Sequence, residues 1–160
     1  MEETAILTSK EIAFLRELDR RGVEFMIVGL AAAALQGAPV VTQDVDLWFK
    51  DPSDARIGKS LKKFGGVLVA PIGDNPPMFA GKNVELFEVV LTMHGLEGFV
   101  EELKNTVTVL LGGVRIKALK LERIIVSKEF LRRKKDELVL PVLKDVLKTL
   151  EAVEARKRKK

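Results

Sequence analysis

Residues 23–49 hold a strand, a glycine, a helix and a second strand in close succession, and this order constrains the fold more than any other feature. "VEFMIVG" (23–29) is almost wholly apolar, which predicts a buried strand. "LAAAALQG" (30–37) is rich in strong helix formers and ends in a glycine suited to a C-cap. "DVDLWF" (44–49) alternates enough to predict another strand. Two strands joined through a helix indicate helices packed on a sheet.

The rest of the chain adds helices and strands to this unit. Thr8 and Glu11 have the spacing of a capping box, and the helix they begin is expected to stop at Gly22. From Leu119 onward the chain is expected to be helical, with a break near Pro141. The other expected elements are a helix that starts at 51–53 and runs to about 64, a strand at 67–70, a loop rich in Pro and Gly at 71–83, a strand at 84–90, a short helix at 95–104 and a hairpin at 106–119 that turns at Gly112-Gly113.

These elements predict an α/β (α+β) fold, a mixed sheet flanked by helices with a helical C-terminal part. We divide the chain into an α/β core at 1–118, a helical segment packed on it at 119–155 and a basic tail at 156–160. The apolar stripe of the helix after Pro141 could pack on the core or on a second copy in a homodimer.

Composition narrows the class of protein. The 160 residues include no cysteine, which excludes disulfides and thiolate metal sites. The longest apolar run, residues 25–35, is too short to span a membrane, and we expect a cytoplasmic protein. The tail "RKRKK" (156–160) carries five positive charges, and removing them from the net charge of +4 leaves −1. That tail is expected to be a solvated, disordered end, or else a nonspecific contact for RNA phosphates. Abundant Lys, Arg and Glu with few Gln indicate a thermophilic source.

Asp44 and Asp46 are the first candidates for chemistry. On a strand, residues two apart point to the same face with Cα atoms about 6.5 Å apart. Two carboxylates so placed repel each other unless a cation lies between them, and Mg²⁺ prefers oxygen ligands. The alternative is that both acids cap the strand or face water. Gly29, which ends the first strand before a helix, could let the backbone approach a phosphate, or could serve only a tight turn.

"VGLAA" (28–32), Gly37 and "VVTQDVD" (40–46) resemble motifs of the nucleotidyltransferase superfamily related to DNA polymerase beta. More narrowly, they resemble the small abortive-infection-type toxin nucleotidyltransferases, a toxin-antitoxin-like group. The resemblance implies a Mg²⁺- or Mn²⁺-dependent enzyme that moves a nucleotidyl group from an NTP to a hydroxyl or phosphate acceptor. The acceptor is left open between RNA, a protein and a small molecule.

The resemblance also implies site residues. Asp44 and Asp46 would bind metal together with a third acid, expected at Glu85 in "NVELF" (83–87), with Glu88 as the weaker candidate. "LERIIVSK" (121–128) and "RKKD" (133–136) are similar to a later family segment. The residues expected at the nucleotide are Gly29, Leu30, Thr42, Lys128 and Asp136. The alternative for the basic run is a solvated helix face.

Four departures from the family pattern bear on activity, and the lost glycine and arginine in particular favour a second hypothesis. Leu30 stands where relatives have a second glycine or a serine, Val40 replaces an arginine, the third acid Glu85 is a glutamate rather than an aspartate, and Val139 replaces an aspartate. These changes suit a catalytically degenerate module that binds nucleotide, RNA or protein on the same fold. Trp48 is expected in the core or a pocket wall, and His94 at the surface or in a cap.

Overall fold

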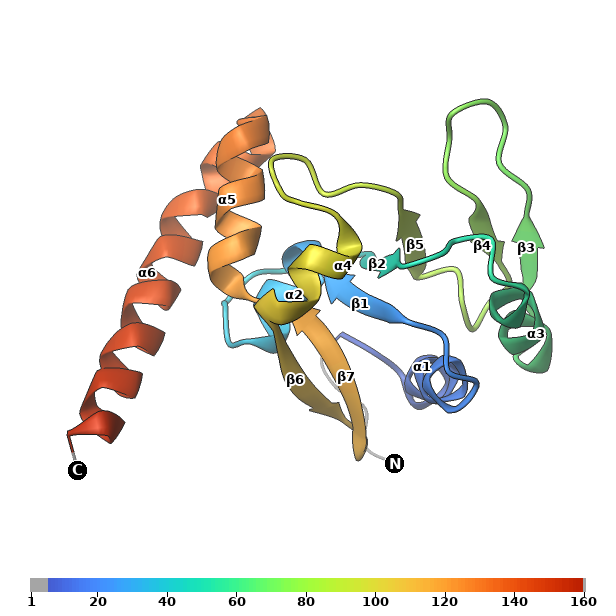
Figure 1. The fold of residues 1–160 in the computed structure, drawn as a ribbon, viewed down its shortest axis with the longest axis horizontal. Coiled ribbons are helices and arrows are strands. Elements are labelled where there is room, and N and C mark those ends of the chain that lie inside the picture. The colour runs from blue at the N-terminus through green and yellow to red at the C-terminus, as the bar shows by residue number, and fades with distance from the viewer. Residues whose placement is uncertain (1–5, 160) are drawn as a thin grey trace.

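The computed structural model describes residues 6–159, which form a seven-stranded mixed sheet with helices on both faces (Figure 1). The strand order is β3-β4-β5-β2-β1-β7-β6, in which β1 and β7, and also β2 and β5, run parallel and the other neighbours are antiparallel. The strands are β1 Phe25–Val28, β2 Val45–Phe49, β3 Val67–Val69, β4 Met78–Ala80, β5 Phe87–Val90, β6 Thr106–Leu111 and β7 Val114–Leu119. The helices are α1 Ser9–Arg20, α2 Gly29–Leu35, α3 Ala55–Lys63, α4 Phe99–Glu102, the 3₁₀ turn η1 Leu103–Asn105, α5 Leu121–Leu131 and α6 Lys134–Arg158. The predicted α/β class is confirmed.

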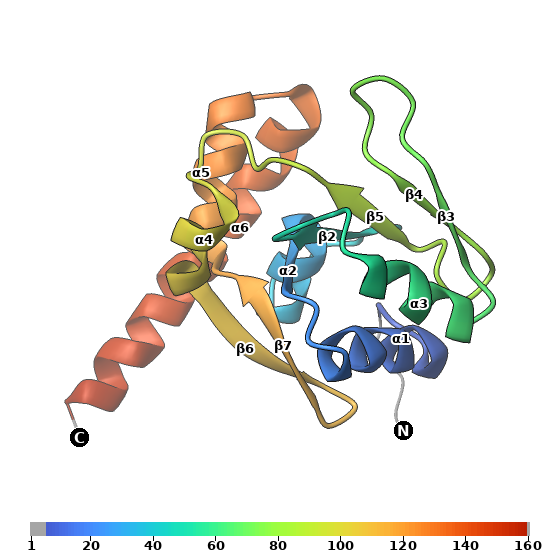
Figure 2. The same ribbon diagram turned by 45° about the vertical axis from the view of Figure 1, so that its right-hand side comes forward.

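One face of the sheet is covered by α1 and α3, which lie beside each other in Figure 2. Phe14 of α1 is fully buried there, with its ring 5.9 Å from that of Phe79 and 5.3 Å from that of Phe87. Aromatic rings at such distances add to the stabilisation from burial alone. Because successive strand residues alternate between faces, the side chains of Asp46 and Glu88 lie on the opposite face.

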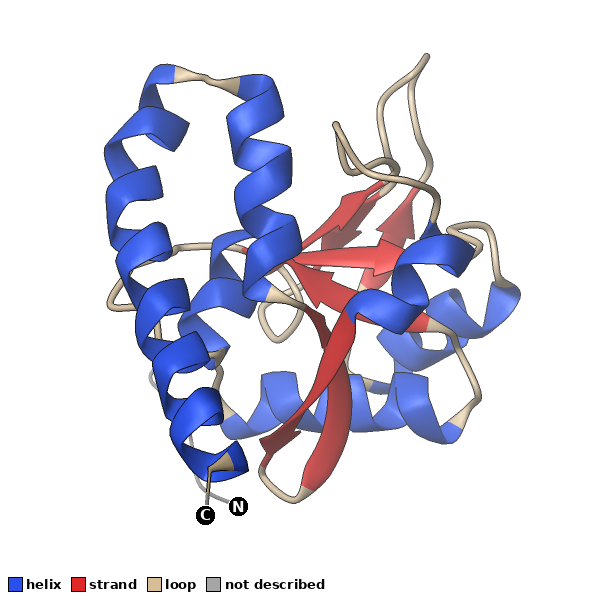
Figure 3. Ribbon diagram, turned by 60° about the vertical axis from the view of Figure 1, so that its left-hand side comes forward, coloured by secondary structure: helices blue, strands red, loops and turns tan. Residues whose placement is uncertain are grey.

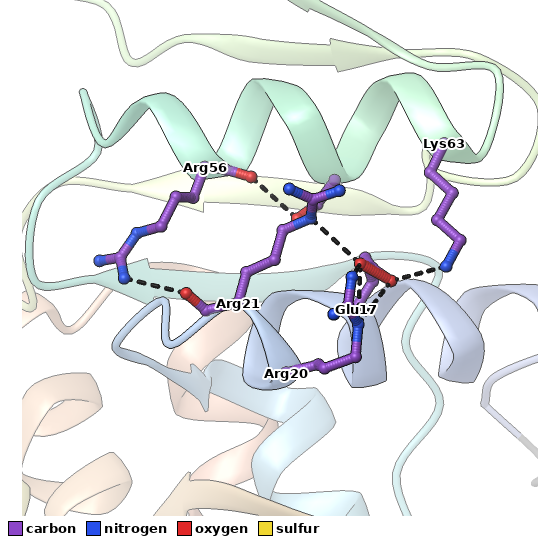
Figure 4. A network of polar contacts seen from close by, with 6 residues as sticks. Glu17, Arg20, Arg21, Arg56 and Lys63 are labelled. Atoms are coloured by element: carbon purple, nitrogen blue, oxygen red, sulfur yellow. Dashed lines mark hydrogen bonds and ion pairs between the residues drawn. The ribbon is translucent and has the colours of Figure 1, made fainter.

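A charged network ties α1 to α3 on the covered face. The Glu17 carboxylate, 4% exposed, accepts hydrogen bonds from Arg20 and Arg21 of its own helix end and from Lys63 of α3 at 2.9 Å (Figure 4). Arg56 of α3 donates back to the Arg21 carbonyl at 2.9 Å. These bonds satisfy a buried carboxylate, which would otherwise be strongly destabilising. The predicted capping box at the start of α1, between Thr8 and Glu11, is confirmed.

The C-terminal part is a pair of helices, α5 and α6, that pack against each other (Figure 3). The predicted break at Pro141 is wrong, because α6 continues through it. Pro141 is exposed, so the carbonyl that lacks its hydrogen bond can be solvated. The chain turns instead at Arg132, which has a left-handed backbone with φ 46°. The predicted disordered tail is also wrong for residues 156–158, which are helical.

Two other boundaries differ from the prediction. The expected loop at 71–83 contains β4, and the strand expected at 84–90 begins only at Phe87. The hairpin that turns at Gly112-Gly113 is confirmed, as is the strand before α2. Within residues 6–159, no helix combines the length and apolar character that crossing a membrane requires.

Candidate functional site

A cavity of about 670 Å³ opens on the face of the sheet opposite α1 and α3. Its floor comes from neighbouring strands, where Asp46 pairs with Val28 of β1 on one side and with Glu88 of β5 on the other. Directly paired residues on adjacent strands point to the same face, so Asp46 and Glu88 stand next to each other. The walls come from the loop after β3, the loop after β5, and helices α5 and α6.

Asp46 lies in an unusual electrostatic environment. Burial, and after it the nearby negative charges of Glu88 and Asp44, raise the pKa of its carboxyl to about 6, against the opposing effect of the positive charges of Lys128 and Lys135. A carboxylate that is both desolvated and surrounded by like charge is poised to bind a cation. The three acids are therefore close enough to affect one another.

The Asp46 side chain requires a glycine at position 29. Its φ of +68° suits glycine, and a Cβ built at this position would lie 2.8 Å from Oδ2 of Asp46. The glycine thus provides space for the carboxylate, which is a different role from the predicted contact with a phosphate. Leu30, which follows it in α2, is half-buried and lines the cavity.

Asp44 and Thr42 belong to the connection that leads into β2. The Thr42 hydroxyl donates to the Asp44 carbonyl at 2.7 Å, which fixes this turn of the backbone. Asp44 is exposed and lies one residue before the first residue of β2, and both residues line the cavity. The predicted pair Asp44 and Asp46 is therefore brought to one site.

The opposite wall of the cavity is positive and is organised by a buried acid. The Asp136 side chain is 0% exposed and accepts from Lys128 at 3.2 Å and from Nε of Arg133 at 2.8 Å. Burial alone would raise the pKa of Asp136, but the hydrogen bonds from Arg133 and Lys128 outweigh it and hold this pKa at about 2. Lys135, like Lys128 and Arg133, lines the cavity. Asp136 is therefore enclosed by its partners and holds two cations in place.

Glu85, the expected third acid, is not brought to this site. It lies exposed in the turn before β5 and outside the cavity lining, whereas Glu88 lines the cavity beside Asp46. Strand alternation could have indicated this. Even on a strand covering 84–90, Glu85 would share a face with Phe87 and Val89, two buried residues, while Glu88 would lie on the other face.

The loop after β5 is a part of the site that sequence reasoning missed. His94 lines the cavity, and its carbonyl accepts a 2.6 Å hydrogen bond from the Ser127 hydroxyl of α5. The Phe130 ring covers Gly95, where an added Cβ would lie 2.5 Å from the Phe130 Cβ. These contacts fasten the loop to α5. Asp74, on the loop after β3, also lines the cavity and had no sequence signal.

Oxygen ligands for a cation are present, but they do not form a complete cage. Among residues 6–159, no group of three or more His, Cys, Asp or Glu side chains is arranged to hold a metal ion. Mg²⁺ is commonly held by one or two carboxylates together with substrate phosphates and water. Asp44 and Asp46 suit that mode of binding, since burial and the neighbouring negative charges raise the pKa of the Asp46 carboxyl.

Solved structures whose names describe nucleotidyltransferases share the fold of this chain. The chain is similar to the crystal structure of ANT(2")-Ia in complex with adenylyl-2"-tobramycin (TM-score 0.58, 14% identity, 95% of this chain and 98% of that one). It is also similar to the solution structure of the antibiotic-resistance factor ANT(2'')-Ia (0.62, 13%, 94% and 90%). A third similar structure is an antigenic nucleotidyltransferase-like protein from Paracoccidioides brasiliensis (0.55, 20%, 96% and 91%).

These likenesses support the predicted superfamily at the level of the fold. No protein-family model matches the chain, and neither does any curated protein. The narrower resemblance to abortive-infection-type toxins stays a prediction.

Proposed function

We propose that this protein transfers a nucleotidyl group from an NTP to a hydroxyl acceptor in the cavity over β2 and β5. The observation that carries the proposal is the division of charge across one cavity. Asp44, Asp46 and Glu88 stand on the strand side, and Lys128 and Lys135 on the helix side. A triphosphate with a bound divalent cation needs both kinds of group, because its oxygens bind the metal and the remaining negative charge needs cations.

The positive wall would bind the phosphates. Lys128 is only 12% exposed and is held by Asp136, so its ammonium is already positioned before the nucleotide arrives. Arg133 is fixed by the same carboxylate and remains about half exposed, which leaves part of its guanidinium free to bind an anion. Groups positioned in advance lose less entropy on binding than mobile ones.

Glu88 would act on the acceptor. The acceptor oxygen would attack the α-phosphorus while the bond to the pyrophosphate oxygen breaks, and the electron pair would leave with pyrophosphate. The hydroxyl proton would pass to the exposed Glu88 carboxylate, which adjoins Asp46 across the paired strands. This assignment replaces the predicted Glu85, which lies outside the cavity lining.

Asp44 and Asp46 would hold Mg²⁺ or Mn²⁺. When bound, the ion would neutralise charge on the phosphates and on the departing pyrophosphate. The ion would offset the negative charges that, together with burial, raise the pKa of Asp46. Because it would contact both the acids and the phosphates, cation and nucleotide would each strengthen binding of the other.

The second candidate, a binding module without catalysis, is favoured by Leu30. This residue lines the cavity beside Gly29, where a smaller residue would leave the backbone more accessible. Such a module would bind the nucleotide through the same charges without turning it over.

Calorimetry with ATP and GTP, with and without Mg²⁺, tests nucleotide binding, and pyrophosphate release with a panel of hydroxyl compounds tests transfer. Asp44→Ala should abolish Mg²⁺-dependent binding and release, whereas Asp51→Ala, an exposed acid after β2 outside the cavity lining, should leave both unchanged. Binding without release for any acceptor would favour the module. No binding at any Mg²⁺ concentration would contradict both candidates.

A further inference from the structure

The row of paired residues that contains Asp46 and Glu88 continues across the rest of the sheet. Met78 of β4 pairs with Glu88, and Val69 of β3 pairs with Met78. Directly paired side chains share a face, so both point to the same side as the two acids. The next pair along β3 and β4 on this face is Val67 and Ala80.

These four residues form an open apolar surface, which we call the acceptor platform: Val67, Val69, Met78 and Ala80. Val67 is 63% exposed, Val69 43% and Met78 66%, and Ala80 is also exposed. The opposite face of the same strands is different, because Phe79 is buried against Phe14 of α1. None of the four platform residues carries a charge, so the surface is apolar up to the edge of Glu88.

The platform lies on the side of Glu88 away from the cations. Lys128 belongs to α5, which packs against α2, and α2 directly follows β1. In the sheet, β1 and β2 lie on one side of β5 while β4 and β3 lie on the other (Figure 1). A nucleotide whose phosphates contact α5 and α6 therefore leaves the β4 side of Glu88 to the acceptor.

The loop between β3 and β4 joins the platform to the cavity. Asp74 and Pro76 of this loop line the cavity, while the strands that carry the platform begin and end at the loop. A surface that continues into a cavity wall suits a small molecule better than a partner macromolecule with a flat surface. Neighbouring strands are about 4.8 Å apart, so the platform extends about 10 Å from β5 to β3, the length of two to three fused or linked rings.

We infer that the acceptor is a small hydroxyl compound with an uncharged, apolar body about 10 Å long, which lies on the acceptor platform and presents its hydroxyl to Glu88. The inference rests on the proposed function and adds the substrate class. Apolar side chains stabilise such a body by removing its surface from water, whereas a polycation would find no ion pair on these four residues.

Methionine methyl signals make a sharp test, because the three described methionines report on different places. Met78 lies on the platform, Met93 lines the cavity, and Met26 is buried with 0% exposure. Protein labelled with ¹³C at the methionine methyls is mixed with Mg²⁺ and a nonhydrolysable ATP analogue, and then with biphenyl-4-ol or tobramycin. We expect the analogue to shift Met93, biphenyl-4-ol to shift Met78 in a saturable manner, tobramycin to leave Met78 unchanged, and Met26 to stay constant.

A transfer assay then uses radiolabelled ATP and biphenyl-4-ol. Met78→Lys should lower kcat/KM for biphenyl-4-ol by about tenfold through loss of apolar contact, while affinity for the nucleotide analogue is unchanged. Leu110→Lys is the matched control, since Leu110 is 69% exposed on β6 at the other edge of the sheet and should change neither quantity.

Different results would overturn the two proposals separately. Nucleotide binding at Met93 without any effect of biphenyl-4-ol on Met78 would overturn the inference and leave the proposed function standing. A Met78 signal that moves with protein concentration alone would identify the platform as a contact between copies, which also overturns the inference. If the analogue does not bind at all, the proposed function fails and the inference fails with it.

Discussion

At position 29, only glycine leaves room for the Asp46 carboxylate in its present conformation. The backbone at Gly29 has φ +68°, and a Cβ there would lie 2.8 Å from Oδ2 of Asp46. The contact is with the carboxylate itself, so a larger residue would have to displace the group on which the site depends.

Gly29→Ala should therefore damage the site as well as the fold. The positive φ costs a non-glycine residue about 1–2 kcal/mol, and the clash adds displacement of Asp46. We expect a lower free energy of urea unfolding and Mg²⁺-dependent ATP binding weakened at least about tenfold. Gly37→Ala is the matched control, since Gly37 has φ +101° and no atom within 4 Å of an added Cβ. It should lose stability but retain ATP affinity; equal affinity in both variants would contradict the role assigned to Gly29.

The raised pKa of Asp46 predicts how stability changes with pH when a chelator keeps cations away. Since the folded protein binds this proton more tightly than the unfolded chain, stability falls as pH rises from about 3.8 to about 6. Asp46→Asn removes this loss. Above pH 7 we expect the variant to exceed the wild type by about 2 kcal/mol in urea unfolding, and near pH 3.5 to equal it.

At high pH, Mg²⁺ should reverse the difference in stability between the wild type and Asp46→Asn. Millimolar Mg²⁺ at pH 8 should raise the melting temperature of the wild type and have little effect on Asp46→Asn, because the cation relieves the repulsion among the acids. If the wild type is equally stable at pH 5 and pH 8 in the presence of a chelator, the proposed crowding of negative charge around Asp46 is contradicted.

The sequence allowed the fold to be predicted where local signals were strong. The apolar strand before Gly29, the capping box at Thr8 and the hairpin at Gly112-Gly113 depend on residues close in sequence, and all are present. Asp44 and Asp46 were predictable as a pair because they are two residues apart in the sequence, although Asp44 lies one residue before β2. Strand alternation separates Glu88 from Glu85, but its position beside Asp46 depends on which strand pairs with β2, and a parallel pairing between residues 42 apart leaves no local pattern.

The boundary between α5 and α6 also could not be predicted from local sequence patterns alone. Proline has a strong local preference against helix interiors, which predicted a break at Pro141. The break occurs instead at Arg132 and Arg133, where the buried Asp136 accepts from the Arg133 backbone N–H at 3.1 Å and from two cationic side chains. The bonds from Arg133 are local, since it stands three residues before Asp136 as in a capping box. The burial of Asp136 and its bond from Lys128 depend instead on the packing of α5 against α6, which local propensity does not contain.

Asp136 is the next test, because it holds Lys128 and Arg133 without being accessible itself. Asp136→Asn leaves two cations facing a neutral amide, and we expect about 3 kcal/mol of destabilisation and weaker ATP binding at a temperature where the protein remains folded. Glu129→Gln is the control. Glu129 also pairs with a lysine of α6, Lys144 at 3.2 Å, but its side chain is 36% exposed. Normal ATP affinity in folded Asp136→Asn would show that the cations need no anchor.

Glu17 gives a prediction of the opposite sign for pH, far from the cavity. Hydrogen bonds from Arg20 and Lys63 outweigh burial and lower the pKa of Glu17 to about 2. The lowered pKa means stability that is fully present above pH 4.5 and lost as pH falls toward 2. Because all three cationic partners are partly solvated, we expect Glu17→Gln to lose only about 1–2 kcal/mol in urea unfolding at pH 7, and its difference from the wild type to shrink as pH approaches 2.

Glu24→Gln is the control for this last prediction. Glu24 pairs with Lys50 at 3.0 Å, but both side chains are about half exposed, so the variant should stay within about 0.5 kcal/mol of the wild type at every pH. The contrast compares a buried carboxylate that has three cationic partners with an exposed carboxylate that has one. If Glu17→Gln loses no more than Glu24→Gln at pH 7, the Glu17 network does not stabilise the packing of α1 on α3. ATP binding should be unchanged in both variants, because neither residue lines the cavity.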